Sequence, residues 1–123
     1  MIKIGIIGGS GLDDPQLLGS PAEIEVTTPF GKPSSMLTTG TISGVPVVIL
    51  ARHNKDHSLT PSNVPFRANI HALKEQGCTH ILATTACGSL REEIEPGRLI
   101  FPDQFIDRTT KRVTTFFEGP EVV

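Results

Sequence analysis

Three short apolar segments of the sequence are each followed by residues whose chemistry suits an anion. The segments are residues 3–7, 45–51 and 80–83, and they run into GGSG, RH and TTACGS respectively. Hydroxyls, backbone N–H groups and a guanidinium all bind phosphate or carboxylate oxygens. The residue types therefore predict an oxyanion site built from Ser10, Arg52, His53, Thr85 and Ala86.

The apolar segments themselves predict how these residues meet. A short apolar run bounded by turn residues is typical of a buried strand. In open α/β sheets, ligands bind outside the carboxyl ends of the strands. If the three strands are parallel neighbours, the five candidate residues converge at one edge of the sheet.

The sequence predicts an α/β fold, a mixed twisted β-sheet flanked by helices. The tight Ser43-Gly44 link predicts an antiparallel hairpin, which makes the sheet mixed. A helix over residues 65–76 would then serve as a crossover between two parallel strands. Strands are expected over residues 2–7, 23–27, 35–42, 45–51, 80–84 and 98–106.

Local signals mark the ends of the predicted helices. Ser62 or Asn63 is expected to cap the 65–76 helix, and Gly77 is expected to end it. Phe66 is expected on its apolar face. One helical turn is expected over residues 90–95.

Composition and charge argue against several classes of partner. The 123 residues include 11 basic and 13 acidic side chains, a net charge of −2, which is unlike the basic surface of a nucleic-acid binder. There is no basic amphipathic segment, and no apolar run near the roughly 18 residues that a transmembrane helix needs. Cys78 and Cys87 bracket a predicted strand, too far apart to bridge, and free thiols suit a reducing cytosol. We expect a cytoplasmic protein without nucleic-acid or membrane partners.

Less specific interpretations of the same residues stay open. The glycines around Ser10 could form a simple flexible turn, and residues 52–57 could be a solvated polar loop. A dinucleotide fingerprint is incomplete, because Asp14 stands where its third glycine would be, and no Walker A motif is present. His53 and His57 are spaced for a metal, but no third ligand is evident, so no metal is expected.

Read together, several segments resemble the nucleoside phosphorylase family, and within it the branch that acts on 5′-methylthioadenosine. The resemblance covers nearly the whole chain. It is carried by KIGIIGGSGLDDP at residues 3–15, TPFGKPS at 28–34, ARH at 51–53, ALKEQGCTHILATTACGSLREEIEPG at 72–97 and DQFIDRT at 103–109.

The resemblance implies phosphorolysis of methylthioadenosine to adenine and 5-methylthioribose 1-phosphate, in purine and methionine salvage. Inorganic phosphate would be the co-substrate, no organic cofactor or metal would be needed, and the protein would be a homo-oligomer, a trimer or hexamer. Methylthioinosine or ordinary purine nucleosides are alternative substrates. By motif, the phosphate would be held by Ser10, Arg52, His53, Thr85 and Ala86.

Length is the main departure from the family. Family chains are much longer, and their remaining part supplies the base and ribose site, including the aspartate that helps protonate the purine. Residues 1–123 are therefore expected to be the N-terminal, phosphate-binding part of a single phosphorylase domain. If so, the chain is expected to be inactive alone. The paired aromatics Phe116 and Phe117 are expected to contact the absent part of the domain. An inactive phosphate-binding fragment is the alternative of another class.

Overall fold

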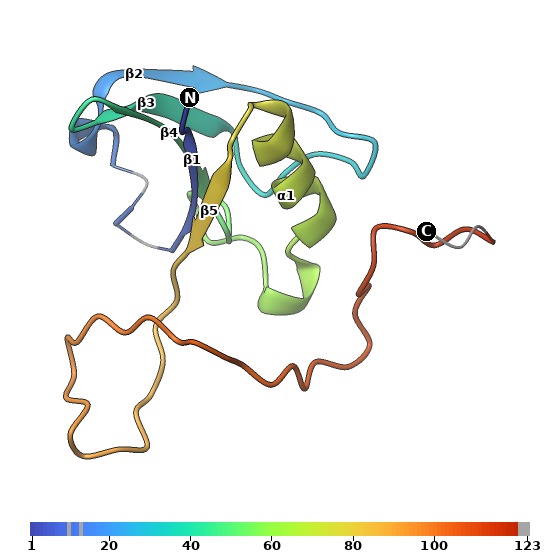
Figure 1. The fold of residues 1–123 in the computed structure, drawn as a ribbon. Helices are drawn as coiled ribbons and strands as arrows, with labels where there is room; N and C mark the ends of the chain where they lie inside the picture. Colours follow the sequence, from blue (N-terminus) through green and yellow to red (C-terminus); the bar gives the residue numbers. More distant parts are fainter. Residues whose placement is uncertain (10, 13, 121–123) are drawn as a thin grey trace. The chain divides into compact units, whose positions relative to one another are not determined.

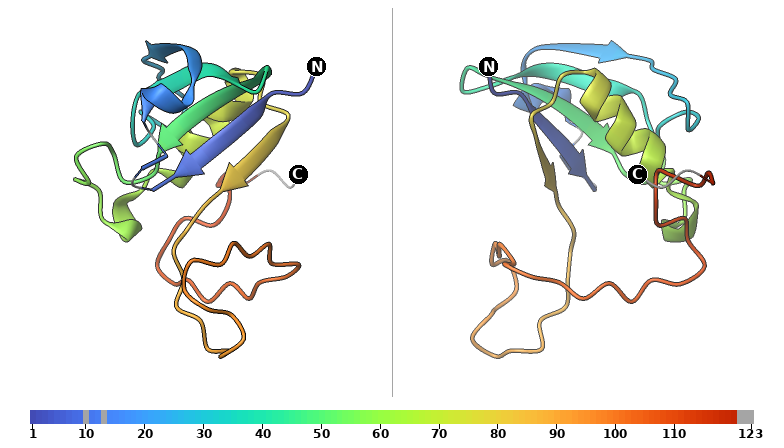
Figure 2. Two further views of the ribbon diagram at one scale, coloured as in Figure 1. Left: turned by 90° about the vertical axis from the view of Figure 1, so that its left-hand side faces the viewer. Right: turned by 45° about the vertical axis from the view of Figure 1, so that its right-hand side comes forward.

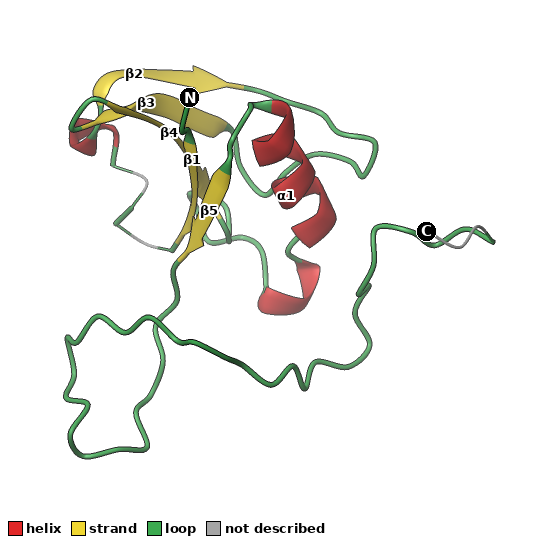
Figure 3. Cartoon of the chain, viewed as in Figure 1, coloured by secondary structure: helices red, strands yellow, loops and turns green. Residues whose placement is uncertain are grey.

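The computed structural model describes residues 1–9, 11–12 and 14–120. The chain divides into two units, Met1–Thr85 and a second unit from Ala86 onward. All the helices and strands of the described residues lie in the first unit, and the described residues after β5 (His80–Ala83) are drawn as loop (Figure 1, Figure 3). The expectation that the chain forms part of a single domain stays a prediction.

The first unit is built on one mixed β-sheet with strand order β2-β3-β4-β1-β5. β1 pairs in parallel with β4 on one side and with β5 on the other. β3 pairs antiparallel with both β2 and β4. The predicted α/β fold with a mixed sheet is confirmed. The strands are β1 (Ile4–Gly8), β2 (Gly19–Ile24), β3 (Leu37–Ile42), β4 (Val45–Ala51) and β5 (His80–Ala83).

The hairpin between β3 and β4 forms where the sequence predicts it. Ile42 pairs with Val45, so only Ser43 and Gly44 make the turn. Their φ angles are 49° and 78°. Two positive φ angles are what a type I′ turn requires, and this turn matches the twist of the strands it joins.

One α-helix, α1 (Phe66–Glu75), packs along one face of the sheet (Figure 2). Its buried residues Ala72 and Leu73 form a core cluster with apolar residues of three strands. The strand members of this cluster are Ile7, Leu37, Val48 and Leu50. Because side chains alternate along a strand, Val47 and Ile49 of β4 face the other side, where they pack with Leu18. α1 connects β4 to β5, as predicted for a crossover.

The start of α1 differs from the prediction. Pro65 occupies the N-cap position, and no side chain caps the helix. Ser62 and Asn63 belong instead to a short 3₁₀ helix, η2 (Pro61–Asn63). Val64 has φ −62° and ψ 124°, the extended conformation that a residue before proline prefers, so the helix cannot continue back to the predicted caps. Phe66 is 42% exposed rather than part of the apolar face.

The second strand also lies earlier than predicted. β2 covers Gly19–Ile24, after a 3₁₀ helix, η1 (Pro15–Leu17), instead of residues 23–27. Its pairing with β3 ends at Ile24 opposite Leu37. Val26 lies beyond β2 but packs against the core, so the alternation in the sequence reflects burial of Val26 rather than strand pairing.

The second unit contains neither of its predicted elements. Residues 90–95 make only a turn, closed by a 3.2 Å hydrogen bond from Ile94 N to the Arg91 carbonyl. Residues 98–106 form an irregular loop with a bend at Asp103, and they pair with no strand of the described chain. A strand is stable only when its backbone groups have partners, and Pro102 offers no N–H. Apolar side chains therefore stay exposed, among them Phe101 at 79%.

No helix among the described residues is long and apolar enough to span a bilayer.

The end of α1 is set by Gly77, as predicted. The Cys78 N–H donates to the Leu73 carbonyl at 3.1 Å, and the Gly77 N–H donates to the Lys74 carbonyl at 2.9 Å. Gly77 has φ 76°. This pattern is a Schellman motif, which satisfies the last carbonyls of the helix through one left-handed residue.

We expect Gly77→Ala to lower the free energy of unfolding by about 1 kcal/mol. A Cβ at this position meets nothing within 4 Å, so the cost comes from the backbone conformation alone. Gly77→Asn should cost less, because asparagine tolerates positive φ better than alanine. Urea unfolding followed by circular dichroism measures both. Equal stability of Gly77→Ala and the original chain would contradict the left-handed conformation.

Candidate functional site

The carboxyl ends of β1, β4 and β5 lie side by side, as predicted. Gly8 is in register with Ala51 of β4, and Ile7 is in register with Ala83 of β5. The parallel ladders extend one residue further on each side. The Arg52 N–H donates to the Gly8 carbonyl at 2.9 Å, and the Thr84 N–H donates to the Ile7 carbonyl at 3.0 Å. The segments that follow the three strands therefore start from one edge of the sheet.

The Arg52 side chain links two of these segments. Its Nη1 donates to the Thr84 carbonyl at 2.7 Å. That carbonyl belongs to the peptide bond between Thr84 and Thr85. A Cβ placed on Gly9 would lie 3.7 Å from Arg52 Nη2, so the guanidinium also reaches the segment after β1. A guanidinium carries five N–H donors, and the bond to Thr84 uses one of them.

His53 follows Arg52 directly, and its ring is oriented by the backbone. Nδ1 lies 2.9 Å from the Leu59 carbonyl oxygen. A carbonyl only accepts hydrogen bonds, so Nδ1 must carry the proton and donate. In the neutral ring, Nε2 then holds a lone pair and can only accept a hydrogen bond. It becomes a donor when the ring is protonated.

The loop after β4 is held in shape by its own polar groups. Asn54 and His57 have φ angles of 65° and 55°, in the left-handed region. The Asn54 Nδ2 donates to Ser58 Oγ at 3.3 Å, and the Ser58 N–H donates to Asp56 Oδ1 at 3.0 Å. Hydrogen bonds from Ser58 lower the pKa of the Asp56 carboxyl. These contacts close the loop that carries Arg52 and His53.

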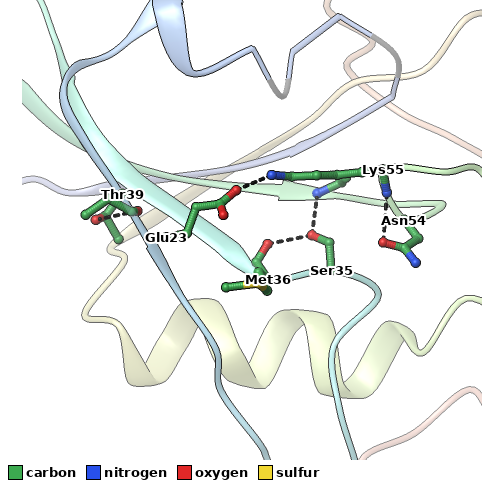
Figure 4. Close-up of polar contacts among 8 residues, drawn as sticks. Glu23, Ser35, Met36, Thr39, Asn54 and Lys55 are labelled. Carbon is green, nitrogen blue, oxygen red and sulfur yellow. Dashed lines mark hydrogen bonds and ion pairs between the residues drawn. The ribbon is translucent and has the colours of Figure 1, made fainter.

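Two serines support the last residue of β4. The pairing of β3 with β4 ends at Leu37 opposite Leu50. Beyond it, Ser34 Oγ donates to the Ala51 carbonyl at 2.6 Å, and Ser35 Oγ accepts from the Ala51 N–H at 3.0 Å. Ser35 also donates to the Met36 carbonyl (Figure 4). The two hydroxyls thus replace the missing strand partner beside Arg52.

The five predicted site residues do not all lie in the same described part of the structure. Arg52, His53 and Thr85 belong to the first unit, and Arg52 bonds directly to the carbonyl group that precedes Thr85. Ser10 lies outside the described residues, and Ala86 begins the second unit. The phosphate-binding role of all five stays a prediction. Sequence reasoning did not assign a role to Ser34 and Ser35, although they lie in or beside the TPFGKPS segment.

Within residues 1–9, 11–12 and 14–120, no group of three or more His, Cys, Asp and Glu side chains is placed to hold a metal ion.

This arrangement defines an α/β protein in which three neighbouring parallel strands end at one edge of the sheet, the edge at which open α/β sheets bind ligands. A sequence model of the phosphorylase superfamily matches residues 3–122. The chain therefore belongs to the phosphorylase superfamily, and the family resemblance of its motifs is confirmed.

Relatives with established names support the same family. The S-methyl-5′-thioadenosine phosphorylase of Danio rerio is 62% identical over 118 residues, which are 96% of this chain and 42% of that protein. The Drosophila melanogaster enzyme of the same name is 60% identical over 96% of this chain and 41% of its own. A structure of methylthioadenosine phosphorylase from Schistosoma mansoni in complex with adenine has a TM-score of 0.89 at 52% identity. It covers 98% of this chain and 43% of that chain. The chain thus spans less than half the length of these relatives.

The two cysteines differ in environment, which predicts which one reacts first. Cys78 packs against the core, and burial raises the pKa of its thiol. Cys87 is exposed. Alkylation requires the thiolate, so iodoacetamide near pH 8 should modify Cys87 well before Cys78.

Mass spectrometry of peptides over time measures the two rates. A Cys87→Ser variant should retain only the slow reaction, and that reaction should accelerate as the pH rises. Faster modification of Cys78 than of Cys87 would contradict the packing described for Cys78.

Proposed function

We propose that this chain forms the phosphate-binding part of an enzyme that cleaves methylthioadenosine with inorganic phosphate. The observation that carries the proposal is the Arg52 guanidinium, held by the Thr84 carbonyl at the joint end of three parallel strands. The names of the relatives add support, as does a Schistosoma mansoni phosphorylase mutant crystallised with methylthioadenosine.

The proposed reaction exchanges one bond at the anomeric carbon. A phosphate oxygen bonds to that carbon while the glycosidic C–N bond breaks, through an oxocarbenium-like state. The purine leaves with the bonding electrons and takes up a proton. The products are adenine and 5-methylthioribose 1-phosphate, and neither an organic cofactor nor a metal takes part.

The candidate residues divide the work of holding phosphate. Arg52 supplies the permanent positive charge, and His53 supplies a directional hydrogen bond. Ser10 and Thr85 contribute hydroxyls, and Ala86 contributes its backbone N–H. Donors fixed before the substrate arrives place the nucleophile and offset its charge without reorganisation during the reaction.

The base and ribose sites belong to the rest of the proposed enzyme. The chain spans 42% of the Danio rerio relative, so we assign the purine-protonating residue to sequence that corresponds to the remainder. The proposed enzyme is a cytoplasmic homo-oligomer, a trimer or hexamer, in purine and methionine salvage.

Other purine nucleosides are alternative substrates for the proposed enzyme. Methylthioinosine and ordinary purine nucleosides would use the same phosphate residues. Adenosine belongs in the comparison, because one Schistosoma mansoni relative is named adenosine/methylthioadenosine phosphorylase. An inactive phosphate-binding fragment is the alternative of a different class.

We expect Arg52→Lys to weaken phosphate binding at least tenfold, measured by isothermal titration calorimetry with inorganic phosphate. Lysine keeps the charge but loses the planar fork that contacts the Thr84 carbonyl and an anion together. The matched control is Arg91→Lys, because Arg91 is exposed in the second unit and paired with Glu93. Equal phosphate affinity of the original chain, Arg52→Lys and Arg91→Lys would argue against Arg52 as the anion-binding residue.

A second prediction concerns catalysis. Adenine release from methylthioadenosine should be absent for the 123-residue chain and present, only with phosphate, for a chain of the relatives' full length. An adenine-specific assay with and without phosphate, repeated with methylthioinosine and adenosine, measures both. Phosphate-independent release by the full-length chain would contradict phosphorolysis. Phosphate-dependent release by the short chain would contradict the assignment of the base site.

A further inference from the structure

Asn69 is a fully buried polar side chain in the apolar face of α1. It is 1% exposed, and it shares the buried face of the helix with Ala72 and Leu73. Burying an amide costs free energy unless its atoms form hydrogen bonds. Asn69 Oδ1 accepts a hydrogen bond from the Ser34 N–H at 2.8 Å. The amide therefore ties the helix to the loop that precedes β3.

Ser34 in turn contacts the last residue of β4. It is 4% exposed, and its hydroxyl donates to the Ala51 carbonyl at 2.6 Å. On the same residue, the Ala51 N–H donates to Ser35 Oγ. Both backbone groups of Ala51 are thus held by adjacent serines, and Asn69 fixes the position of the first of them.

Ala51 directly precedes Arg52. The Arg52 N–H bonds to Gly8 on the opposite side of β4, so the chain is held from both sides at the residue where it leaves the sheet. The direction in which Arg52 leaves the strand determines where its guanidinium meets the Thr84 carbonyl.

We propose that Asn69 is a positioning residue for anion binding, acting through Ser34 and Ala51 on the orientation of Arg52. The inference rests on the proposed phosphate role of Arg52. This role would explain why an amide, and not an apolar side chain, occupies position 69 on the buried face of α1. A purely structural role would change stability without changing the site.

Asn69→Ala separates the two roles when compared with Leu73→Val. Leu73 is fully buried on the same helix and carries no polar atom, so its truncation destabilises the core without removing a hydrogen bond to Ser34. Circular dichroism first sets a temperature at which the original chain and both variants are folded. The two readouts are the phosphate affinity by calorimetry and the hydrogen exchange of the Arg52 amide relative to the Val48 amide.

We expect Asn69→Ala to weaken phosphate binding about five- to tenfold, within the range of roughly two- to twelvefold that one lost hydrogen bond gives. It should also accelerate exchange of the Arg52 amide relative to that of Val48. Leu73→Val should leave phosphate affinity within about twofold and raise the two exchange rates together, because loss of core packing favours global opening.

Ser34→Ala provides a second route if Asn69→Ala does not fold. It removes the hydroxyl bond to Ala51 and leaves α1 unchanged, and it should shift both readouts in the same direction. If the variants at Asn69 and Ser34 behave like Leu73→Val in both readouts, Asn69 is structural only and the inference is overturned.

Failure of the proposed function gives a different result. If the original chain binds no phosphate, the phosphate role of Arg52 fails. The relative exchange of the Arg52 amide then decides alone whether Asn69 positions Arg52. Selective acceleration in Asn69→Ala supports it; its absence from Asn69→Ala, or from Ser34→Ala where Asn69→Ala does not fold, overturns it.

Discussion

The contact between the Arg52 guanidinium and the Thr84 carbonyl joins the ends of β4 and β5 across β1. It depends on the parallel register, because only parallel strands bring their carboxyl ends to the same edge of the sheet. The permanent charge of arginine is thereby fixed beside the segments that follow β1 and β5. Core packing of α1 against Val48 and Leu50 holds β4 in the middle of the sheet, so the position of the charge follows from apolar burial on the helix-covered face.

Much of this arrangement could be predicted from residue types. The apolar run 45–51 predicts β4 with its observed bounds, and Gly77 predicts the end of α1. Both features are set by local signals in the sequence. The convergence of the three strand ends is predicted only on the condition that the strands are parallel neighbours, and the structure supplies that condition. Asn69 could not be predicted in this way. Its role depends on the Ser34 N–H, which is 35 residues away in the sequence, and helical periodicity alone treats a polar residue on the apolar face as an exception.

The errors share a physical origin in partners that local patterns do not reveal. Residues 98–106 have the composition of a strand, yet a strand needs a neighbour to satisfy its backbone, and the described chain provides none there. β2 is displaced toward Gly19 because its pairing with β3 sets its bounds, whereas the apolar alternation continues to Val26 through contact with the core. β5 lies where the sequence predicts a strand, but the prediction that it is buried is wrong: its four residues are exposed, Ile81 at 39%, at the edge of the sheet formed by the described residues.

The orientation of His53 bears on which form of phosphate such a site would suit. The Leu59 carbonyl commits Nδ1 to donating, so Nε2 of the neutral ring offers only a lone pair. A fully deprotonated oxyanion would meet that lone pair with repulsion, whereas the hydroxyl of monohydrogen phosphate would donate to it. The Arg52 guanidinium, by contrast, only donates and pairs with the charged oxygens. With a neutral His53 ring, these adjacent residues offer opposite hydrogen-bonding roles, and a phosphate that keeps at least one proton would satisfy both.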